Sequence, residues 1–304
     1  DGFAEMTSRR ITAVAGDVTS DGLGLDADGL AALASCDIVI HSAAVVSFDS
    51  PLDQAVEVNL LGPVRIVETL ASLGATPHLV TVSTCYVAGS RRGRAPEEPV
   101  DASSFFVDVD WRTEVDAARR IRLDTETESR TPANLKAFRS EAHGELGAAG
   151  IPSLAAKTEQ LRCRWVDDKM AQAGIARAGS LGFPDAYAFT KALGEIAVAE
   201  SAGDVPISVV RPAIIESAHS EPSPGWIRGF RMAEPVIISY ARGLLKEFPG
   251  VPEGTVDVIP VDFVVAAICA VAARGPLGPD EGADIVQVAS GSVNPLRYGH
   301  LVDM

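Results

Sequence analysis

The sequence is poor in cysteine and histidine, and neither residue type is spaced for a framework role. The four cysteines are spread along 304 residues without a Cys-x-x-Cys pair: Cys36, Cys85, Cys163 and Cys269. We therefore expect neither a disulfide framework nor a zinc knuckle, and a reducing cytoplasmic location fits better. The five histidines also show no metal-ligand spacing, so no metal site is expected.

Basic residues are outnumbered, with 26 Lys and Arg against 41 Asp and Glu, a net charge of −15. A nucleic-acid-binding protein needs a dominant basic face, so we expect no nucleic-acid partner. Arginines gather in two places only, first at Arg91, Arg92 and Arg94, and then at Arg119, Arg120 and Arg122. We interpret both groups as solvated surface, with a docking patch for a phosphate-rich or acidic partner as the alternative.

Long apolar runs are absent as well. The longest run lies near residues 264–273, which is about half the length of a membrane span and is typical of a buried helix. No signal peptide, internal repeat or low-complexity tract is visible. With 47% hydrophobic and 22% charged residues, the composition is that of an ordinary globular protein.

Short apolar strands alternate with amphipathic helices along most of the chain. Strands are expected at residues 10–15, 37–41, 78–82 and 207–211, and helices at residues 29–35, 53–73 and 187–202. Gly74 ends the second of these helices. This order predicts an α/β protein with a Rossmann-like, doubly wound parallel sheet.

Residues 89–182 interrupt this alternation with a charged and mostly helical stretch. Thr131 is a candidate N-cap with Pro132 at the first helical position. An apolar stripe follows at helical spacing, formed by Leu135, Phe138, Ala142 and Leu146. A second helix is expected to start at Ser153, to bury Leu154, Leu161 and Trp165, and to stop at Gly174. We expect these stripes to pack within the protein rather than hold a ligand.

The segment 185–195 carries the strongest chemical signal. Tyr187 and Lys191 lie four residues apart among good helix formers, which places them one above the other on a helix face. An ammonium beside a phenol favours the phenolate and makes the phenol a better acid or base near neutral pH. The spacing also arises by chance, so the neighbouring segments decide its meaning.

Polar or small residues follow several of the expected strands. Asp17 follows the first and can accept the amino group of an adenine ring, although a simple turn explains it equally well. Ala43 and Ala44 follow the second strand and would let a flat cofactor approach the backbone, or merely form a tight turn. Asn59 lies in the middle of a helix, where a buried amide must be hydrogen bonded, and this favours a backbone or water-relay role.

Two further segments complete the set. Ser83 and Thr84 follow the strand at residues 78–82. Thr84 therefore places a hydroxyl at the carboxyl edge of the sheet, where it can donate a hydrogen bond to a substrate carbonyl. Residues 211–215 follow the strand after the helix of Tyr187, and they can wall a nicotinamide with an apolar face.

Together these segments resemble the extended short-chain dehydrogenases and, within them, the fatty acyl-CoA reductases. The pieces are Ile40-His41-Ser42-Ala43-Ala44 with Phe48, Asn59 with Gly62, Val82 to Val87, Tyr187 to Glu195, Arg211-Pro212 followed by Pro222-Ser223-Pro224-Gly225-Trp226, and Ser290 to Tyr298. The Pro-Gly-Trp and Ser-Gly-x-x-Asn-Pro pieces are the discriminating ones, whereas the Tyr/Lys and Ala-Ala pieces occur across the whole superfamily.

The resemblance implies NADPH-dependent reduction of an acyl thioester to an aldehyde and, with a second hydride, to an alcohol. It implies that Thr84 and Tyr187 polarise the carbonyl, while Lys191 holds the nicotinamide ribose and tunes Tyr187. The implied cofactor-binding residues are Asp17, Val18, Ala43, Ala44, Val45, Asn59, Tyr187, Lys191, Pro212, Ile214 and Ile215. The acyl chain would lie under residues 216–248 and against the insertion.

The resemblance also gives a domain division. Residues 1–89 and 183–216 would form the dinucleotide-binding core, residues 90–182 a helical insertion, and residues 217–304 a substrate-binding region. The family's Gly-x-x-Gly-x-x-Gly loop is not in the sequence, and the first expected strand matches the family's third. We interpret this as an omitted N-terminal part of about two βα units, which would also carry the residues that select NADPH over NADH.

Several alternatives remain open at this point. A terminal thioester reductase of the carboxylic-acid-reductase kind shares the Thr, Tyr and Lys set. A dinucleotide-sensing protein is a different class, but it has no need of the Tyr187 hydroxyl. An epimerase or steroid dehydrogenase of the extended type is disfavoured by the Pro-Ser-Pro-Gly-Trp piece. The donor is acyl-CoA or an acyl-carrier protein, the latter an awkward partner for so acidic a chain. Peripheral membrane contact and oligomeric state are left open.

Overall fold

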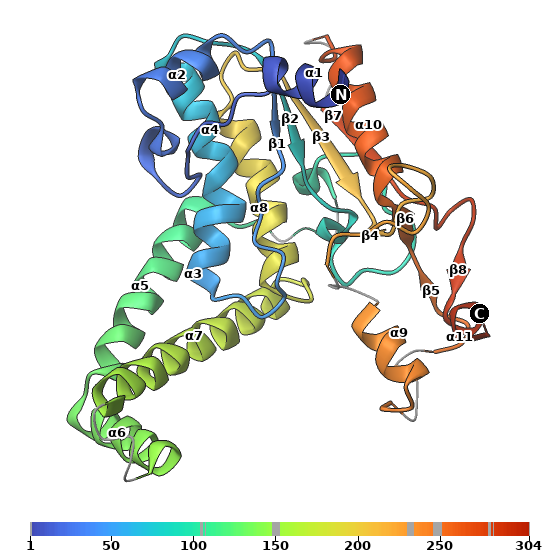
Figure 1. The fold of residues 1–304 in the computed structure, drawn as a ribbon. Coiled ribbons are helices and arrows are strands. Elements are labelled where there is room, and N and C mark those ends of the chain that lie inside the picture. Colours follow the sequence, from blue (N-terminus) through green and yellow to red (C-terminus); the bar gives the residue numbers. More distant parts are fainter. Residues whose placement is uncertain are drawn as a thin grey trace. The chain divides into compact units, whose positions relative to one another are not determined.

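The computed structural model describes residues 2–103, 106, 108–147, 153–229, 234–245, 251–278, 281 and 283–303 (Figure 1). The chain divides into two compact units. The first unit comprises Asp1–Asp37, Ala43–Pro77 and Val107–Val205, and the second comprises Ile38–Ser42, His78–Phe106 and Pro206–Met304.

A four-stranded parallel sheet forms the centre of the second unit. Its strands are β1 (Ile38–His41), β2 (His78–Val82), β3 (Ile207–Pro212) and β7 (Asp284–Val288), in the order β1-β2-β3-β7. The strands at 37–41, 78–82 and 207–211 predicted from their apolar runs are thereby confirmed. Helix α10 (Val261–Arg274) packs against β2, β3 and β7, and a core of Val80, Val210 and Val271 joins the two layers.

The strand predicted at residues 10–15 is wrong. Helix α1 (Gly2–Arg10) covers its first residue, and residues 11–17 have neither helix nor strand structure. Ile11 and Val14 are exposed. A strand is stabilised by hydrogen bonds to a neighbouring strand, and in the described chain β1 pairs only with β2, so nothing pairs with this segment.

Short elements extend the second unit beyond the sheet. Strand β4 (Ile214–Glu216) pairs in parallel with β6 (Val258–Pro260), and β5 (Thr255–Val256) pairs antiparallel with β8 (Leu296–Arg297). The remaining elements are the 3₁₀ turns η3 (Cys85–Ala88) and η4 (Val100–Ala102) and the helices α9 (Glu234–Ala241) and α11 (Tyr298–Asp303). Of the expected substrate segment 216–248, residues 230–233 and 246–248 lie outside the described residues.

Among the described residues of the first unit, the regular elements are all helices or helical turns. Its amino-terminal half holds η1 (Asp21–Gly24), α2 (Ala27–Ala34), α3 (Leu52–Ala55), the π-helical turn η2 (Val56–Leu60) and α4 (Leu61–Ser72). The helices predicted at 29–35 and 53–73 are confirmed, although the second is broken by the π turn. Helix α4 ends before Gly74, whose φ of 63° suits glycine. Helix α8 (Ala186–Ser201) corresponds to the predicted helix at 187–202.

The described residues of the predicted helical stretch contain three α-helices: α5 (Trp111–Ser129), α6 (Pro132–Leu146) and α7 (Leu154–Ser180). Helices α5 and α7 are in contact, and α6 packs on the amino-terminal half of α7 (Figure 1). The side chain of Thr131 accepts a hydrogen bond from the N–H of Asn134 at 3.5 Å, which confirms the predicted N-cap. Phe138, Ala142 and Leu161 form a buried cluster, as the apolar spacing predicts.

The predicted stop at Gly174 is wrong, because α7 continues to Ser180. A Cβ at Gly174 would lie 3.0 Å from the Cβ of Ala186 and 3.4 Å from that of Leu52. The glycine therefore serves close packing within the first unit and does not end the helix. Among the described helices, none combines the length and hydropathy required to cross a lipid bilayer.

Candidate active site

Helix α8 positions the Tyr187 and Lys191 pair in the first unit. The carboxylate of Asp185 caps the helix by accepting a hydrogen bond from the N–H of Ala188 at 2.8 Å. Tyr187 lies in the first turn and is half-buried, and its ring meets the ring of Phe48 edge-on at 6.1 Å. Lys191 lies one turn further along and is 5% exposed.

The burial of Lys191 changes its acid–base behaviour. Burial lowers the pKa of Lys191 from 10.5 to about 8, and the negative charge of Glu195, one turn further along α8, opposes that shift. The ammonium is still the main form at neutral pH, but it can lose its proton close to the physiological range. An ionisable group whose pKa lies this close to neutral pH is typical of functional sites.

Asn59 joins the segment after β1 to the helices of the first unit. Its amide oxygen accepts a hydrogen bond from the N–H of Val45, and its amide nitrogen donates to the carbonyl of Val45, both at 2.9 Å. The same nitrogen donates to the hydroxyl of Thr190 on α8 at 3.3 Å. Asn59 is 1% exposed, so this buried amide is hydrogen bonded as its position in the sequence requires. The backbone following Ala44 is thereby fixed against α8.

The π turn that carries Asn59 approaches α8 very closely at Gly194. A Cβ at Gly194 would clash with the carbonyl oxygen of Asn59 and would lie 3.4 Å from the Cα of Leu60. Only glycine allows the two backbones this separation. The sequence shows the glycine but not this role, because the contact joins residues more than one hundred positions apart.

Asp17 and Val18 lie in an exposed loop of the first unit. The carboxylate of Asp17 accepts hydrogen bonds from the N–H and the hydroxyl of Thr19, each at 2.8 Å. These bonds, led by that from the Thr19 backbone, lower the pKa of Asp17. The guanidinium of Arg65 donates to the carbonyl of Val18 at 3.2 Å and to that of Glu57 at 2.8 Å, which connects the loop to the π turn.

In the second unit, Thr84 follows the carboxyl end of β2, as predicted. It is buried and caps η3, with its hydroxyl oxygen accepting a hydrogen bond from the N–H of Tyr86 at 3.1 Å. That bond uses the oxygen as an acceptor, so the hydroxyl proton can be donated to a second group. The thiol of the adjacent Cys85 donates to the carbonyl of Arg211 on β3 at 3.1 Å, which fixes the turn to the neighbouring strand.

Pro212, Ile214 and Ile215 lie at the carboxyl end of β3 and in β4, and Ile215 is exposed. The carboxylate of Asp257 supports the same edge, accepting hydrogen bonds from the N–H groups of Ser290 at 2.9 Å and Gly291 at 2.8 Å. This contact explains why the Ser-Gly-x-x-Asn-Pro piece is placed here: the turn is held to the segment that precedes β6.

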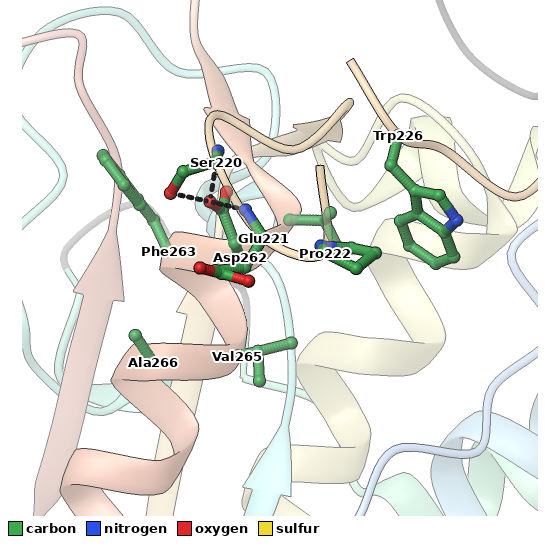
Figure 2. Close-up of a pocket in the computed structure, with 9 residues that line it drawn as sticks. Ser220, Glu221, Pro222, Trp226, Asp262, Phe263, Val265 and Ala266 are labelled. Carbon is green, nitrogen blue, oxygen red and sulfur yellow. Dashed lines mark hydrogen bonds between the residues drawn. The ribbon is translucent and has the colours of Figure 1, made fainter. Parts of the chain in front are cut away.

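A pocket of about 600 Å³ opens at the amino end of α10 in the second unit. Its lining is mainly apolar and includes Pro222 and Trp226 from the Pro-Ser-Pro-Gly-Trp piece, and Phe263, Val265 and Ala266 from α10 (Figure 2). The volume is within the usual range for small-molecule sites. Because β4 follows β3 and β6 leads into α10, the pocket lies at the carboxyl edge of the sheet, the edge that also carries Thr84.

Asp262 holds one wall of this pocket and is absent from the sequence-based set of site residues. Its carboxylate accepts a hydrogen bond from the N–H group of His219 at 2.9 Å. It also accepts hydrogen bonds from the N–H groups of Ser220 at 2.8 Å and Glu221 at 3.1 Å (Figure 2). Burial raises the pKa of Asp262, but these bonds outweigh it and hold the pKa below its usual range. The available signal was an acidic residue in the first turn of a helix, which is too common to single it out.

The predicted residues thus fall into two groups. The first unit holds Asp17, Val18, Ala43, Ala44, Val45, Asn59, Tyr187 and Lys191, and the second unit holds Thr84, Pro212, Ile214 and Ile215. The donor chemistry of the first group fits parts of a dinucleotide: a carboxylate for an adenine amino group, and an ammonium and a phenol for ribose hydroxyls. Glycines for the pyrophosphate are not among these residues.

Solved structures show the class of fold to which this arrangement belongs. The terminal reductase domain from the myxalamid biosynthetic pathway matches with a TM-score of 0.56 at 17% identity, covering 98% of this chain and 54% of that one. A reductase domain of a nonribosomal peptide synthetase from Mycobacterium tuberculosis gives 0.53 at 20% identity, covering 99% and 56%. The chain therefore has the Rossmann-like α/β fold with a parallel sheet, as predicted.

The family follows from the sequence comparison. The family model described as Male sterility protein matches residues 2–268, and the chain belongs to this family. It is 31% identical to the chloroplastic fatty acyl-CoA reductase 2 of Arabidopsis thaliana, covering 97% of this chain and 44% of that protein. It is 30% identical to the alcohol-forming fatty acyl-CoA reductase of Simmondsia chinensis, covering 99% and 56%.

These relatives confirm the family resemblance stated from the motifs. The chain spans about half the length of the curated relatives it matches.

Proposed function

We propose that the protein reduces fatty acyl thioesters, with NADPH as reductant, to fatty aldehydes and, after a second reduction, to alcohols. The observation that carries the proposal is the pair on α8: a half-buried Tyr187 and, one turn away, a buried Lys191 whose pKa is lowered to about 8. Membership of a family with fatty acyl-CoA reductases supports the substrate class. The hydroxyl of Thr84 at the carboxyl end of β2 supports the reaction type.

The chemistry requires a hydride donor and a group that manages charge on the carbonyl oxygen. The dinucleotide supplies the hydride when bound. Thr84 and Tyr187 donate hydrogen bonds to the thioester oxygen and stabilise the negative charge that develops there, and Tyr187 supplies the proton. The ammonium of Lys191 stabilises the phenolate left behind. Collapse of the hemithioacetal breaks the carbon–sulfur bond, releases the thiol and leaves the aldehyde.

The proposed cofactor contacts follow from the donor groups of each segment. In the first unit, Asp17 with Val18 would meet the adenine, and the backbone from Ala43 to Val45 would run beside the cofactor in the position that Asn59 fixes. Lys191 and Tyr187 would meet the nicotinamide ribose. In the second unit, Pro212, Ile214 and Ile215 would supply an apolar wall for the nicotinamide.

The pocket at the amino end of α10 is our proposed site for the acyl chain. Trp226 and Phe263 offer it apolar surface, while Asp262 fixes the loop between them (Figure 2). This assignment keeps the functional division made from the sequence, with a dinucleotide-binding core at residues 1–89 and 183–216, a helical insertion at 90–182 and a substrate region at 217–304. None of the four cysteines, all of them described, forms a disulfide, and we propose a reducing compartment such as the cytoplasm.

The test is an assay of NADPH oxidation by the full-length protein with acyl-CoA substrates of increasing chain length. Tyr187→Phe removes the proton donor, so kcat should fall by about 10² to 10⁴ while NADPH binding is retained. Tyr298→Phe, in α11, is the matched control and should retain the parent rate. Parent-like turnover by Tyr187→Phe refutes the assigned proton donor. An absence of oxidation with every thioester favours a dinucleotide-sensing protein instead.

A further inference from the structure

The arginine-rich loop at residues 90–97 lies on the sheet edge that carries Thr84. It follows η3, which itself follows the carboxyl end of β2. Gly89 and Gly93, with φ values of 70° and 105°, allow the chain to turn at both ends of the Arg91–Arg92 pair. The loop therefore begins only a few residues beyond the proposed carbonyl-binding hydroxyl.

Hydrogen bonds anchor this loop at both ends. The guanidinium of Arg91 donates to the hydroxyl of Ser103 at 2.8 Å. The N–H of Gln287, on β7, donates to the carboxylate of Glu97 at 2.6 Å. The side chain of Gln287 donates to the carbonyls of Ala95 at 3.2 Å and Pro96 at 3.0 Å. An anchored loop presents its side chains with little further loss of entropy on binding.

Arg92 and Arg94 are exposed. Within the described part of the chain neither has a carboxylate partner. In the second arginine group, Arg119 pairs with Glu57 at 2.8 Å and Arg122 pairs with Asp167 at 3.0 Å, which leaves Arg120 as the member without a carboxylate partner among the described residues. Of the two groups, the loop at 90–97 is therefore the one in which two arginines, Arg92 and Arg94, have no carboxylate partner among the described residues.

The local charge of this loop opposes that of the whole chain. Three arginines against one glutamate give residues 90–97 a charge of +2, or +1 when the adjoining Glu98 is included, in a protein of net charge −15. At physiological ionic strength charges are screened over about 8 Å. A small polyanion bound here interacts mainly with the arginines, whereas a large acidic protein domain would also be repelled by the net negative charge of the chain. The charge pattern thus favours a compact phosphate-bearing ligand.

We propose that Arg92 and Arg94 bind the nucleotide phosphates of coenzyme A when the acyl group is delivered as acyl-CoA. Guanidinium groups bind phosphate through paired, charge-assisted hydrogen bonds. The inference rests on the proposed function, since it assigns the thiol half of that substrate. It places the thioester beside Thr84 and the phosphates at the following loop, and it makes coenzyme A, not a carrier protein, the preferred donor.

The experiment compares the full-length protein with Arg92→Gln/Arg94→Gln, using the same acyl group on coenzyme A and on pantetheine. The variant should raise KM for acyl-CoA about 10- to 100-fold, with kcat unchanged. KM for acyl-pantetheine, which has no nucleotide phosphates, should stay within twofold of the parent. Lys136→Gln/Arg139→Gln, which removes two exposed charges from α6, is the control and should leave both KM values unchanged.

Other outcomes overturn the proposal. Equal changes for both thioesters assign the loop a structural role, and a rise in KM for NADPH alone assigns it to the cofactor. A loss confined to an acyl-carrier protein substrate identifies the carrier as the partner.

Arg92→Lys/Arg94→Lys retains the charge but not the paired geometry, so its KM for acyl-CoA should fall between those of the parent and the glutamine variant.

Direct binding separates this proposal from the reductase proposal. Calorimetric titration with coenzyme A needs no turnover, and it should show affinity that the glutamine variant loses and that falls as salt is raised. Dephospho-coenzyme A should bind the parent more weakly than coenzyme A does. If the parent reduces no thioester but still binds coenzyme A through these arginines, the reductase proposal fails and the loop assignment stands. Parent-like binding by the glutamine variant refutes the loop assignment.

Discussion

Gly194→Ala tests whether the close approach of α8 to the π turn holds the site together. The glycine lies inside α8, where alanine would ordinarily favour the helix by about 1 kcal/mol. At this position, however, the added Cβ would meet the carbonyl oxygen of Asn59, which is backbone and cannot rotate away. The substitution therefore sets a local preference against a tertiary clash.

The clash should prevail. Overpacking in a well-packed interior costs about 1 to 3 kcal/mol, and a clash with backbone places the cost in the upper part of that range, at about 2 to 3 kcal/mol. Subtracting the gain of about 1 kcal/mol in helix propensity leaves a net loss of about 1 to 2 kcal/mol. For a protein of this size, that loss corresponds to a fall of about 2 to 8 °C in Tm. Movement of Asn59 would also loosen its two bonds to Val45, so KM for NADPH should rise while kcat changes little.

Thermal unfolding followed by circular dichroism measures the first effect, and steady-state kinetics with NADPH measures the second. Gly144→Ala, in α6, is the matched control because no atom lies within 4 Å of its added Cβ. That variant should be as stable as the parent or slightly more stable. If Gly194→Ala behaves like the control in both assays, the close contact does not support the site and the argument is wrong.

Four further predictions address charge and positioning. As the pH rises through about 8, Lys191 loses its proton, so kcat should fall on the alkaline side, and Lys191→Arg should move that limb to higher pH; a limb that does not move contradicts the role of the ammonium. In the unfolded chain the pKa of Lys191 returns to 10.5, so between pH 8 and 10.5 the unfolded state binds one more proton than the folded state. The free energy of unfolding should therefore rise as the pH is raised from 8 to 10.5, because the cost of burying the charged ammonium is relieved, and denaturant midpoints measure this rise. Asp262→Ala frees the loop at 219–221 and should raise KM about tenfold for long-chain but not short-chain acyl-CoA, whereas an equal change for both would remove the loop from acyl binding. Asp284→Asn weakens the buried carboxylate contacts to Ser208 and Arg274 and should cost about 1 to 3 kcal/mol of unfolding free energy, whereas an unchanged denaturant midpoint would show that these contacts are not stabilising.

Local patterns predicted the elements whose structure depends on their own residues. The buried strands β1, β2 and β3 follow from unbroken apolar runs, since a strand covered on both faces has no polar side. The N-cap at Thr131 follows from a hydroxyl placed before Pro132. In these cases a few neighbouring residues hold the information.

The errors arose where a local signal competed with a distant contact. Gly174 has the appearance of a helix stop, yet it lets α7 pack against Ala186 and Leu52. Residues 10–15 have the composition of a strand, yet a strand forms only beside a partner. Asp262 was overlooked because its three partners at 219–221 lie some forty residues earlier in the chain.

Spacing along the chain was enough to predict the alternation of strands and helices, the family, and the position of a phenol and an amine on one helix face, because each depends on which residues follow one another. Tertiary structure decided the burial of Lys191, the clamp of Asn59 on Val45 and the loop fixed by Asp262. Burial, hydrogen bonding between distant segments and the resulting pKa values depend on which surfaces meet, and that is set only when the chain folds.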